Sequence, residues 1–189
     1  MPFSEMRYDN KNIFWFVLFA ANGKAEKITS YLKNSHVECF FPMRYQEKRI
    51  RNSERTSRIL QPVFMNLLFV KSSKVDLDPI LKLVKLQFGI TSDLYYRDKG
   101  TKELIVVPEE PMRNFIAVAS AVDEGIIYLS NEEVRLKRGS KIRITGGIFE
   151  GVEGIFMRIK GERRVVVSLP QFLSVATAFV PRQFILPLE

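Results

Sequence analysis

The sequence of 189 residues contains one cysteine and one histidine. The single cysteine, Cys39, excludes an internal disulfide and is typical of a protein in a reducing compartment. His36 lies three residues before Cys39, but the segment has the pattern of a β-strand, which turns the two side chains to opposite faces. The sequence therefore predicts no metal or nucleophile pair there, no enzyme and no cofactor.

Long apolar runs and phosphate-binding glycine patterns are also lacking. The apolar run of residues 13–21 is far shorter than the roughly 20 residues that span a bilayer. Lys11 before it gives it some likeness to a signal peptide, but a buried strand explains it better. Gly146-Gly147 lacks the Lys-Ser/Thr that completes a P-loop. We expect a soluble, cytoplasmic and monomeric protein without membrane contact.

Positive charge is abundant, with a formal net charge of +8 and a pI near 9.6. Such a balance indicates a polyanionic partner. Residues 44–58 hold six Arg or Lys against two Glu, which is a local balance of +4 and half of the total excess. This stretch supplies the nucleic-acid-binding candidates Lys48, Arg49, Arg51 and Arg55. A charged loop tip without a ligand is the alternative.

The first part of the chain alternates between strand and helix patterns. Strands are expected over residues 13–19, 35–41, 45–50, 61–71, 93–97 and 104–107, and helices over 23–34, 78–85 and from 109 onward. Met112, Phe115, Ile116 and Ala119 should form the buried face of the last helix. This order predicts an α+β fold, in which helices flank a mostly antiparallel sheet over residues 1–121. Residues 122–137 are expected to be a linker with a short strand at 126–129.

The last part of the chain has short strands with glycine corners. Strands are expected over residues 141–145, 155–159 and 163–169, with a bend at Gly146-Gly147 and a hairpin turn at Lys160-Gly161. This pattern predicts a small SH3-like β-barrel over residues 138–189.

Residues 147–154, Gly-Ile-Phe-Glu-Gly-Val-Glu-Gly, follow a strand and resemble the KOW motif of the NusG family of transcription elongation factors. Trp15-Phe16-Val17-Leu18, the helix start at Gly23 and Lys27, the strand 64–70 and Val107-Pro108 resemble that family's N-terminal domain. Residues 37–43 and 147–151 are similar to the specialised RfaH and UpxY-type paralogues. Met65-Asn66 replaces the family's usual Pro-Gly.

The resemblance implies a factor that accompanies RNA polymerase on particular operons, such as surface-polysaccharide operons, and suppresses pausing or termination. An apolar depression that grips the polymerase clamp helices would involve Phe16, Phe19, Phe64 and Leu67. The first helix would contact the non-template DNA strand through Lys24, Lys27, Tyr31 and Asn34. Ordinary core packing and a solvated helix face are the alternatives for these two sets.

The resemblance also implies that the C-terminal barrel binds termination factor Rho or a small-subunit ribosomal protein. Its valine-rich strands favour a permanent barrel over a helical hairpin. The alternative is a KOW-containing RNA-binding protein of the ribosome or translation apparatus. Residues 122–189 carry 10 basic against 8 acidic residues, so most of the positive excess lies in the first domain and favours the polymerase interpretation.

Overall fold

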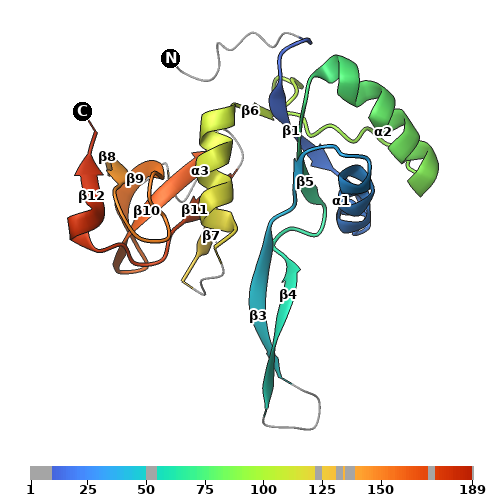
Figure 1. Ribbon diagram of the computed structural model, residues 1–189. Helices are drawn as coiled ribbons and strands as arrows, with labels where there is room; N and C mark the ends of the chain where they lie inside the picture. Colours follow the sequence, from blue (N-terminus) through green and yellow to red (C-terminus); the bar gives the residue numbers. More distant parts are fainter. Residues whose placement is uncertain are drawn as a thin grey trace. The chain divides into compact units, whose positions relative to one another are not determined.

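The computed structural model describes residues 10–49, 55–121, 125–130, 134, 139–169 and 173–188 (Figure 1). The chain divides into two compact units. The first comprises the chain up to Pro42 together with Pro62–Glu109, and the second comprises Met43–Gln61 together with Glu110–Glu189.

An antiparallel sheet of four strands forms the first unit, with the order β2-β5-β1-β6. The strands are β1 (Phe14–Phe19), β2 (Cys39–Phe40), β5 (Leu67–Ser72) and β6 (Val106–Val107). The helices are α1 (Ala25–Asn34) and α2 (Lys74–Phe88), which lie on the same side of β1 and β5 in Figure 1. Trp15 to Leu18 are all buried, which confirms the strand covered on both faces that the apolar run predicted.

Helix α2 is longer than the sequence pattern predicted. It begins at Lys74 because Ser73 caps it: the Ser73 Oγ accepts the Asp76 backbone N–H at 3.2 Å. Pro79 therefore lies inside the helix and not in its first turn, so the expected start at Asp78 is wrong. The helix also continues past its expected end at Lys85 to Phe88, where Gly89 adopts the left-handed conformation (φ 59°, ψ 48°) and ends the helix.

Several expected strands are shorter or interrupted. The strand expected over 61–71 is divided by a bend and turn at residues 63–66, so that β4 (Thr56–Pro62) precedes it and β5 follows it. Residues 35–41 contribute only β2. Residues 93–97 make the isolated bridges Leu18↔Tyr95 and Arg97↔Leu104 in place of a continuous strand.

The second unit contains a six-stranded antiparallel sheet, a two-stranded sheet and helix α3 (Glu109–Ala119). The larger sheet has the order β12-β8-β9-β10-β11-β7. Its strands are β7 (Ile127–Leu129), β8 (Ser140–Ile144), β9 (Glu153–Ile159), β10 (Glu162–Leu169), β11 (Leu173–Ala176) and β12 (Ile185–Pro187). Strands β3 (Met43–Arg49) and β4 form the smaller sheet.

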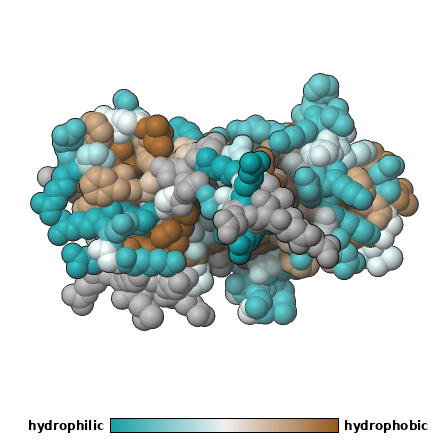
Figure 2. All heavy atoms as spheres, turned by 90° about the horizontal axis from the view of Figure 1, so that it is seen from below, coloured by the Kyte–Doolittle hydropathy of each residue, from teal (hydrophilic) through white to brown (hydrophobic). Residues whose placement is uncertain are grey.

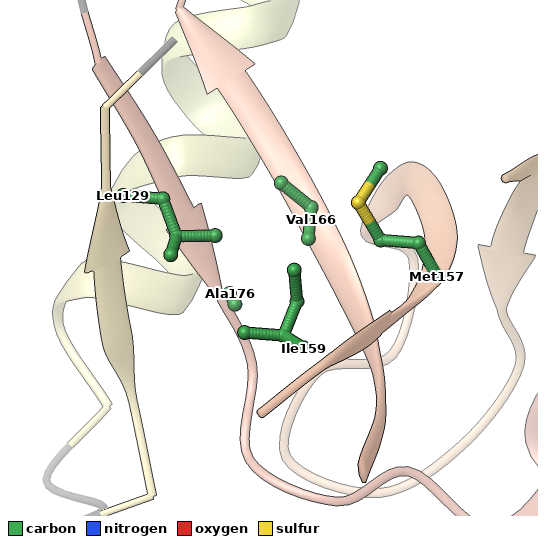
Figure 3. Packing of buried hydrophobic residues seen from close by; sticks show 5 residues of the cluster. All are labelled: Leu129, Met157, Ile159, Val166 and Ala176. Atoms are coloured by element: carbon green, nitrogen blue, oxygen red, sulfur yellow. The ribbon is translucent and has the colours of Figure 1, made fainter. Parts of the chain in front are cut away.

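Strand β7 confirms the short strand expected near residues 126–129 and ties that segment to the sheet. It pairs with β11, from Ser174↔Leu129 to Ala176↔Ile127. Leu129 packs in one apolar cluster with residues from β9, β10 and β11 (Figure 3), namely Met157, Ile159, Val166 and Ala176. The expected linker therefore supplies both a strand and a core side chain to the second unit.

The glycine spacing of residues 147–154 has a separate physical reason at each position. Gly147 and Gly151 have φ angles of 81° and 84°, in the left-handed region that only glycine adopts without strain. Gly154 is required by space, because a Cβ there would lie 2.6 Å from the carbonyl oxygen of Val166 in β10. Phe149, between the first two glycines, is buried.

We predict that Gly154→Ala destabilises the protein by about 3 kcal/mol, because the added methyl group meets backbone and the Val165 side chain. Gly161→Ala should cost only about 1 kcal/mol, since Gly161 (φ 86°) has open space around it and only the conformational strain remains. Urea unfolding of both variants measures the difference. Equal losses would contradict the close approach of β9 and β10.

Candidate functional site

One end of the β1–β5 pair carries apolar side chains that reach solvent. Phe19 and Leu67 stand directly opposite one another in the antiparallel register, so their side chains share one face of the sheet. Phe19 is 39% exposed, Leu67 is half-buried, and the half-buried Tyr96 ring lies 6.3 Å from the Phe19 ring. We call Phe19, Leu67 and Tyr96 the β1–β5 surface. Figure 2 shows hydrophobic residues at the molecular surface among hydrophilic ones.

Phe16 does not belong to this surface. It lies three positions before Phe19 and therefore on the opposite face of the strand. It is fully buried, and its ring meets Tyr95 edge-on at 5.6 Å. The structure thus corrects the expectation of one depression lined by Phe16, Phe19, Phe64 and Leu67, because Phe16 belongs to the core.

Phe64 is half-buried and lies in the bend before β5, not in the strand itself. The next two residues, Met65-Asn66, form a turn that Asn66 fixes twice: its carbonyl accepts the Ala20 N–H at 2.8 Å, and its side-chain oxygen accepts the Gly23 N–H at 3.1 Å. Met65 is 61% exposed. Sequence reasoning missed Met65 as a surface apolar residue, although a large apolar side chain in a turn was a usable signal.

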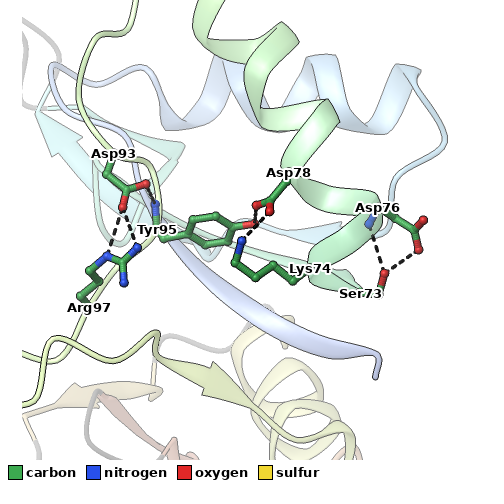
Figure 4. A network of polar contacts seen from close by, with 7 residues as sticks. All are labelled: Ser73, Lys74, Asp76, Asp78, Asp93, Tyr95 and Arg97. Atoms are coloured by element: carbon green, nitrogen blue, oxygen red, sulfur yellow. Dashed lines mark hydrogen bonds and ion pairs between the residues drawn. The ribbon is translucent and has the colours of Figure 1, made fainter. Parts of the chain in front are cut away.

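A polar network holds the segment of residues 93–97 that carries Tyr96 (Figure 4). The Tyr95 hydroxyl donates to Asp78 Oδ1 at 2.7 Å, and the same carboxylate pairs with Lys74. The Tyr96 N–H donates to the Val17 carbonyl at 2.9 Å. Tyr95 is thereby directed toward the core and α2, and Tyr96 is placed beside Phe19.

The protonation of Asp78 is linked to this network. Burial raises the pKa of Asp78, but the hydrogen bonds from Lys74 and Tyr95 together outweigh burial and hold the pKa below its ordinary value of 3.8. The network is therefore strongest while Asp78 is ionised.

A second polar cluster lies on the same sheet face as Phe19. The Trp15 indole N–H donates to Glu109 at 3.0 Å, and Lys71 pairs with both Glu109 at 3.0 Å and Glu38 at 3.4 Å. The hydrogen bond with Glu109 is the main cause that raises the pKa of Lys71. These contacts hold Glu109, which belongs to the first unit, beside the central strands.

Two of the four α1 residues expected at DNA make contacts within the first unit. The Lys24 ammonium donates to the carbonyl of Phe88 at 2.8 Å, at the negative end of α2. The Tyr31 ring packs edge-on against Phe88 at 5.8 Å. Lys27 and Asn34 are exposed. Lys24 and Tyr31 therefore join α1 to the end of α2, whereas Lys27 and Asn34 face solvent.

Strands β3 and β4, which we call the basic ribbon, contain most of the cationic cluster. Every β3 residue after Met43 is exposed, including Lys48 and Arg49. Arg55, just before β4, is exposed as well, and Arg51 lies outside the described residues. The structure thus places three of these four candidates on one short hairpin.

The basic ribbon also carries apolar and aromatic surface. Tyr45 and Leu60 are exposed, and the Arg58 guanidinium lies 4.7 Å from the centre of the Tyr45 ring. A guanidinium stacked on an aromatic ring offers both charge and a flat apolar face. Such a surface suits a nucleic-acid strand better than isolated charges do.

The described residues contain no group of three His, Cys, Asp or Glu side chains that could hold a metal ion. In the same residues, no helix is long and apolar enough to cross a membrane. The features that stand out are surfaces: an apolar aromatic patch on a sheet and a cationic ribbon. The described residues therefore form a protein with one exposed apolar surface and one exposed cationic surface.

The comparison with known families identifies the class of protein that carries these surfaces. A family model described as transcription termination factor nusG matches residues 14–116, which is more than half of the chain. The chain belongs to the NusG family. It is therefore a transcription elongation or termination factor, and factors of this family interact with RNA polymerase and are not known as enzymes.

We predict that Asp78→Asn lowers the free energy of unfolding at neutral pH and makes this free energy less dependent on pH in the acidic range. Since the folded-state pKa of Asp78 lies below 3.8, the unfolded chain takes up the proton first as the pH falls. The stabilisation is present above that value and is lost as the pH falls through the folded-state pKa. Urea unfolding should be measured from neutral pH down to pH values below 3.8. The free energies of unfolding of wild type and Asp78→Asn should converge as the pH falls. Glu103→Gln, which changes an exposed carboxylate, is the control. Parallel curves would contradict this.

Proposed function

We propose that this protein is a specialised elongation and antitermination factor that suppresses pausing or termination on particular operons, such as surface-polysaccharide operons. Its β1–β5 surface docks on the clamp helices of RNA polymerase. The observation that supports this is the Phe19–Leu67 pair, which reaches solvent at the end of two strands whose adjoining residues, 15–18 and 68–70, are buried.

The chemistry of this surface suits a helical partner. An aromatic ring and an aliphatic side chain at neighbouring sheet positions offer a shallow apolar face to side chains that project from a helix. Tyr96 adds a ring with a polar tip, a residue type enriched at protein interfaces. Burying such anchors contributes about 2 kcal/mol or more each.

The basic ribbon and the outer face of α1 serve the non-template DNA strand in this proposal. Lys48, Arg49 and Arg55 supply charge for phosphates, and Lys27 and Asn34 add exposed polar contacts on α1. Lys24 and Tyr31 take a positioning role, because both already contact Phe88.

The second unit carries the partner-recruiting module in this proposal. Residues 138–189 form a KOW-type SH3-like barrel, which holds β structure permanently and binds Rho or a small-subunit ribosomal protein. Residues 1–121 form the polymerase-binding domain, and residues 122–137 connect the two. Support comes from the glycine positions at 147, 151 and 154, each of which meets a physical requirement of the backbone.

We predict that Phe19→Asp weakens binding to core RNA polymerase at least thirtyfold, since about 2 kcal/mol or more is lost with the anchor. Leu86→Asp is the matched control, because Leu86 is 81% exposed on α2 and lies outside the proposed surface. Pull-down and affinity measurements on the full chain test this. Equal binding by the two variants would place the polymerase contact elsewhere, and binding to ribosomes in place of polymerase would refute the proposed function.

We predict that the triple variant Lys48→Gln, Arg49→Gln and Arg55→Gln weakens binding to a single-stranded DNA oligonucleotide. The slope of log affinity against log salt concentration should fall by about 2, because three phosphate contacts at about 0.7 each are removed. The control removes three exposed lysines of the first unit, namely Lys33, Lys82 and Lys99. An equal loss in both variants would show a general charge effect and no specific role of the ribbon.

A further inference from the structure

The second unit contains a cleft that none of the surfaces described above includes. It has a volume of about 630 Å³, which lies in the range of ligand-binding pockets. It opens at the end of the β9–β10 hairpin and beside the segment that follows β11. Its lining residues are Phe156, Arg158, Glu162, Arg163, Phe179, Val180 and Arg182.

Positive charge is concentrated in the lining of the cleft, which holds three arginines and one acidic residue. Arg158 and Arg163 stand directly opposite one another in the β9–β10 register, where like charges are destabilising. The one acidic residue of the lining, Glu162, pairs with the buried Arg164. In the part of the chain that the structure describes, no hydrogen bond or ion pair engages the side chains of Arg158, Arg163 or Arg182.

An exposed aromatic ring lies in the same cleft. Phe179 is 68% exposed, although its neighbours Ala178 and Val180 are both buried. The backbone on each side is therefore held in the unit while the ring faces solvent. Phe156, two residues before Arg158 on β9, is half-buried and lies on the same strand face as Arg158.

The combination of three arginines with an exposed phenylalanine indicates which kind of anionic partner fits the cleft. Phosphate groups match guanidinium groups, which bind them through paired hydrogen bonds. A base stacks on an aromatic ring only where it is unstacked from its neighbours, as in a single strand. A duplex would use the arginines and leave the ring unused, and an acidic peptide carries no base to stack on Phe179.

We propose that this cleft binds single-stranded nucleic acid, with a base stacked on Phe179 and backbone phosphates held by Arg158, Arg163 and Arg182. Stacking makes the site tolerant of sequence, because every base presents an aromatic face. The site gives the six-stranded sheet of the second unit a nucleic-acid contact separate from the basic ribbon, in addition to the protein partner proposed for this unit.

The test uses the full chain in a background that carries Lys48→Gln, Arg49→Gln and Arg55→Gln, so that binding by the basic ribbon is weakened and the cleft accounts for a larger share of the remaining affinity. The probes are fluorescent single-stranded RNA and DNA oligonucleotides of equal length, and the corresponding DNA duplex. Phe179→Ala should weaken single-strand binding about fivefold to 150-fold and leave duplex binding unchanged. Ile148→Ala, which removes a 73% exposed apolar side chain of the same unit, is the matched control.

The double variant Arg158→Gln and Arg163→Gln should reduce the salt slope for single strands by about 1.4, at about 0.7 for each lost phosphate contact. The same variant should raise the midpoint of urea unfolding, because it removes like charges from opposite strand positions. Lys141→Gln, an exposed charge outside the cleft, should do neither.

A higher affinity for RNA would identify a transcript as the ligand, and an equal or higher affinity for DNA would identify an exposed DNA strand; both support the site. Single-strand affinity that stays within twofold in both cleft variants would overturn the proposal. So would an equal loss of duplex and single-strand binding in Phe179→Ala. Displacement of the oligonucleotide by an acidic peptide, with no effect of Phe179→Ala, would assign the cleft to a protein partner instead.

Discussion

The pairing of β1 with β5 is the constraint on which the rest of the first unit depends. The register runs from Phe14↔Ser72 to Phe19↔Leu67 and assigns every side chain of the two strands to one of two faces. One face holds Phe16, which meets Tyr95 beside α2. The other face ends in Phe19 and Leu67 at the surface. A shift of one residue would exchange the two faces, so the register determines which aromatics support the core and which remain available to a partner.

The same residue type therefore has different consequences at neighbouring positions. Truncation of a buried phenylalanine such as Phe16 costs about 3–5 kcal/mol, comparable to much of the stability of a typical domain. Phe19 is partly exposed, and its removal affects the fold less than it affects a partner that covers it. Lys24 and Tyr31 are of residue types that often contact DNA. In this structure both contact Phe88 at the end of α2 and so have a structural role.

Local patterns were sufficient to predict the buried β1, helices α1 and α3, and the glycine corners of the second unit. The patterns failed where distant residues decide the structure. The start of α2 is an exception, because Ser73 caps Asp76 only three residues away and so begins the helix at Lys74, four residues before Asp78. Asn66 divides an apparently continuous strand by bonding to Ala20 and Gly23, more than forty positions away in the sequence. By contrast, the sequence could have predicted that Phe16 and Phe19 lie on opposite faces of β1, because side chains alternate between the two faces of a strand.

Composition was a poor guide to the electrostatics of the second unit. Residues 122–189 are nearly balanced in charge, which argued against a nucleic-acid surface there. Glu153, however, pairs with Arg143 at 2.5 Å, and Glu162 pairs with Arg164. Because these two acids pair with other cations, they do not pair with Arg158 and Arg163 at the end of the β9–β10 hairpin. Net charge sets the average field of a module, but strand register determines where that field is concentrated.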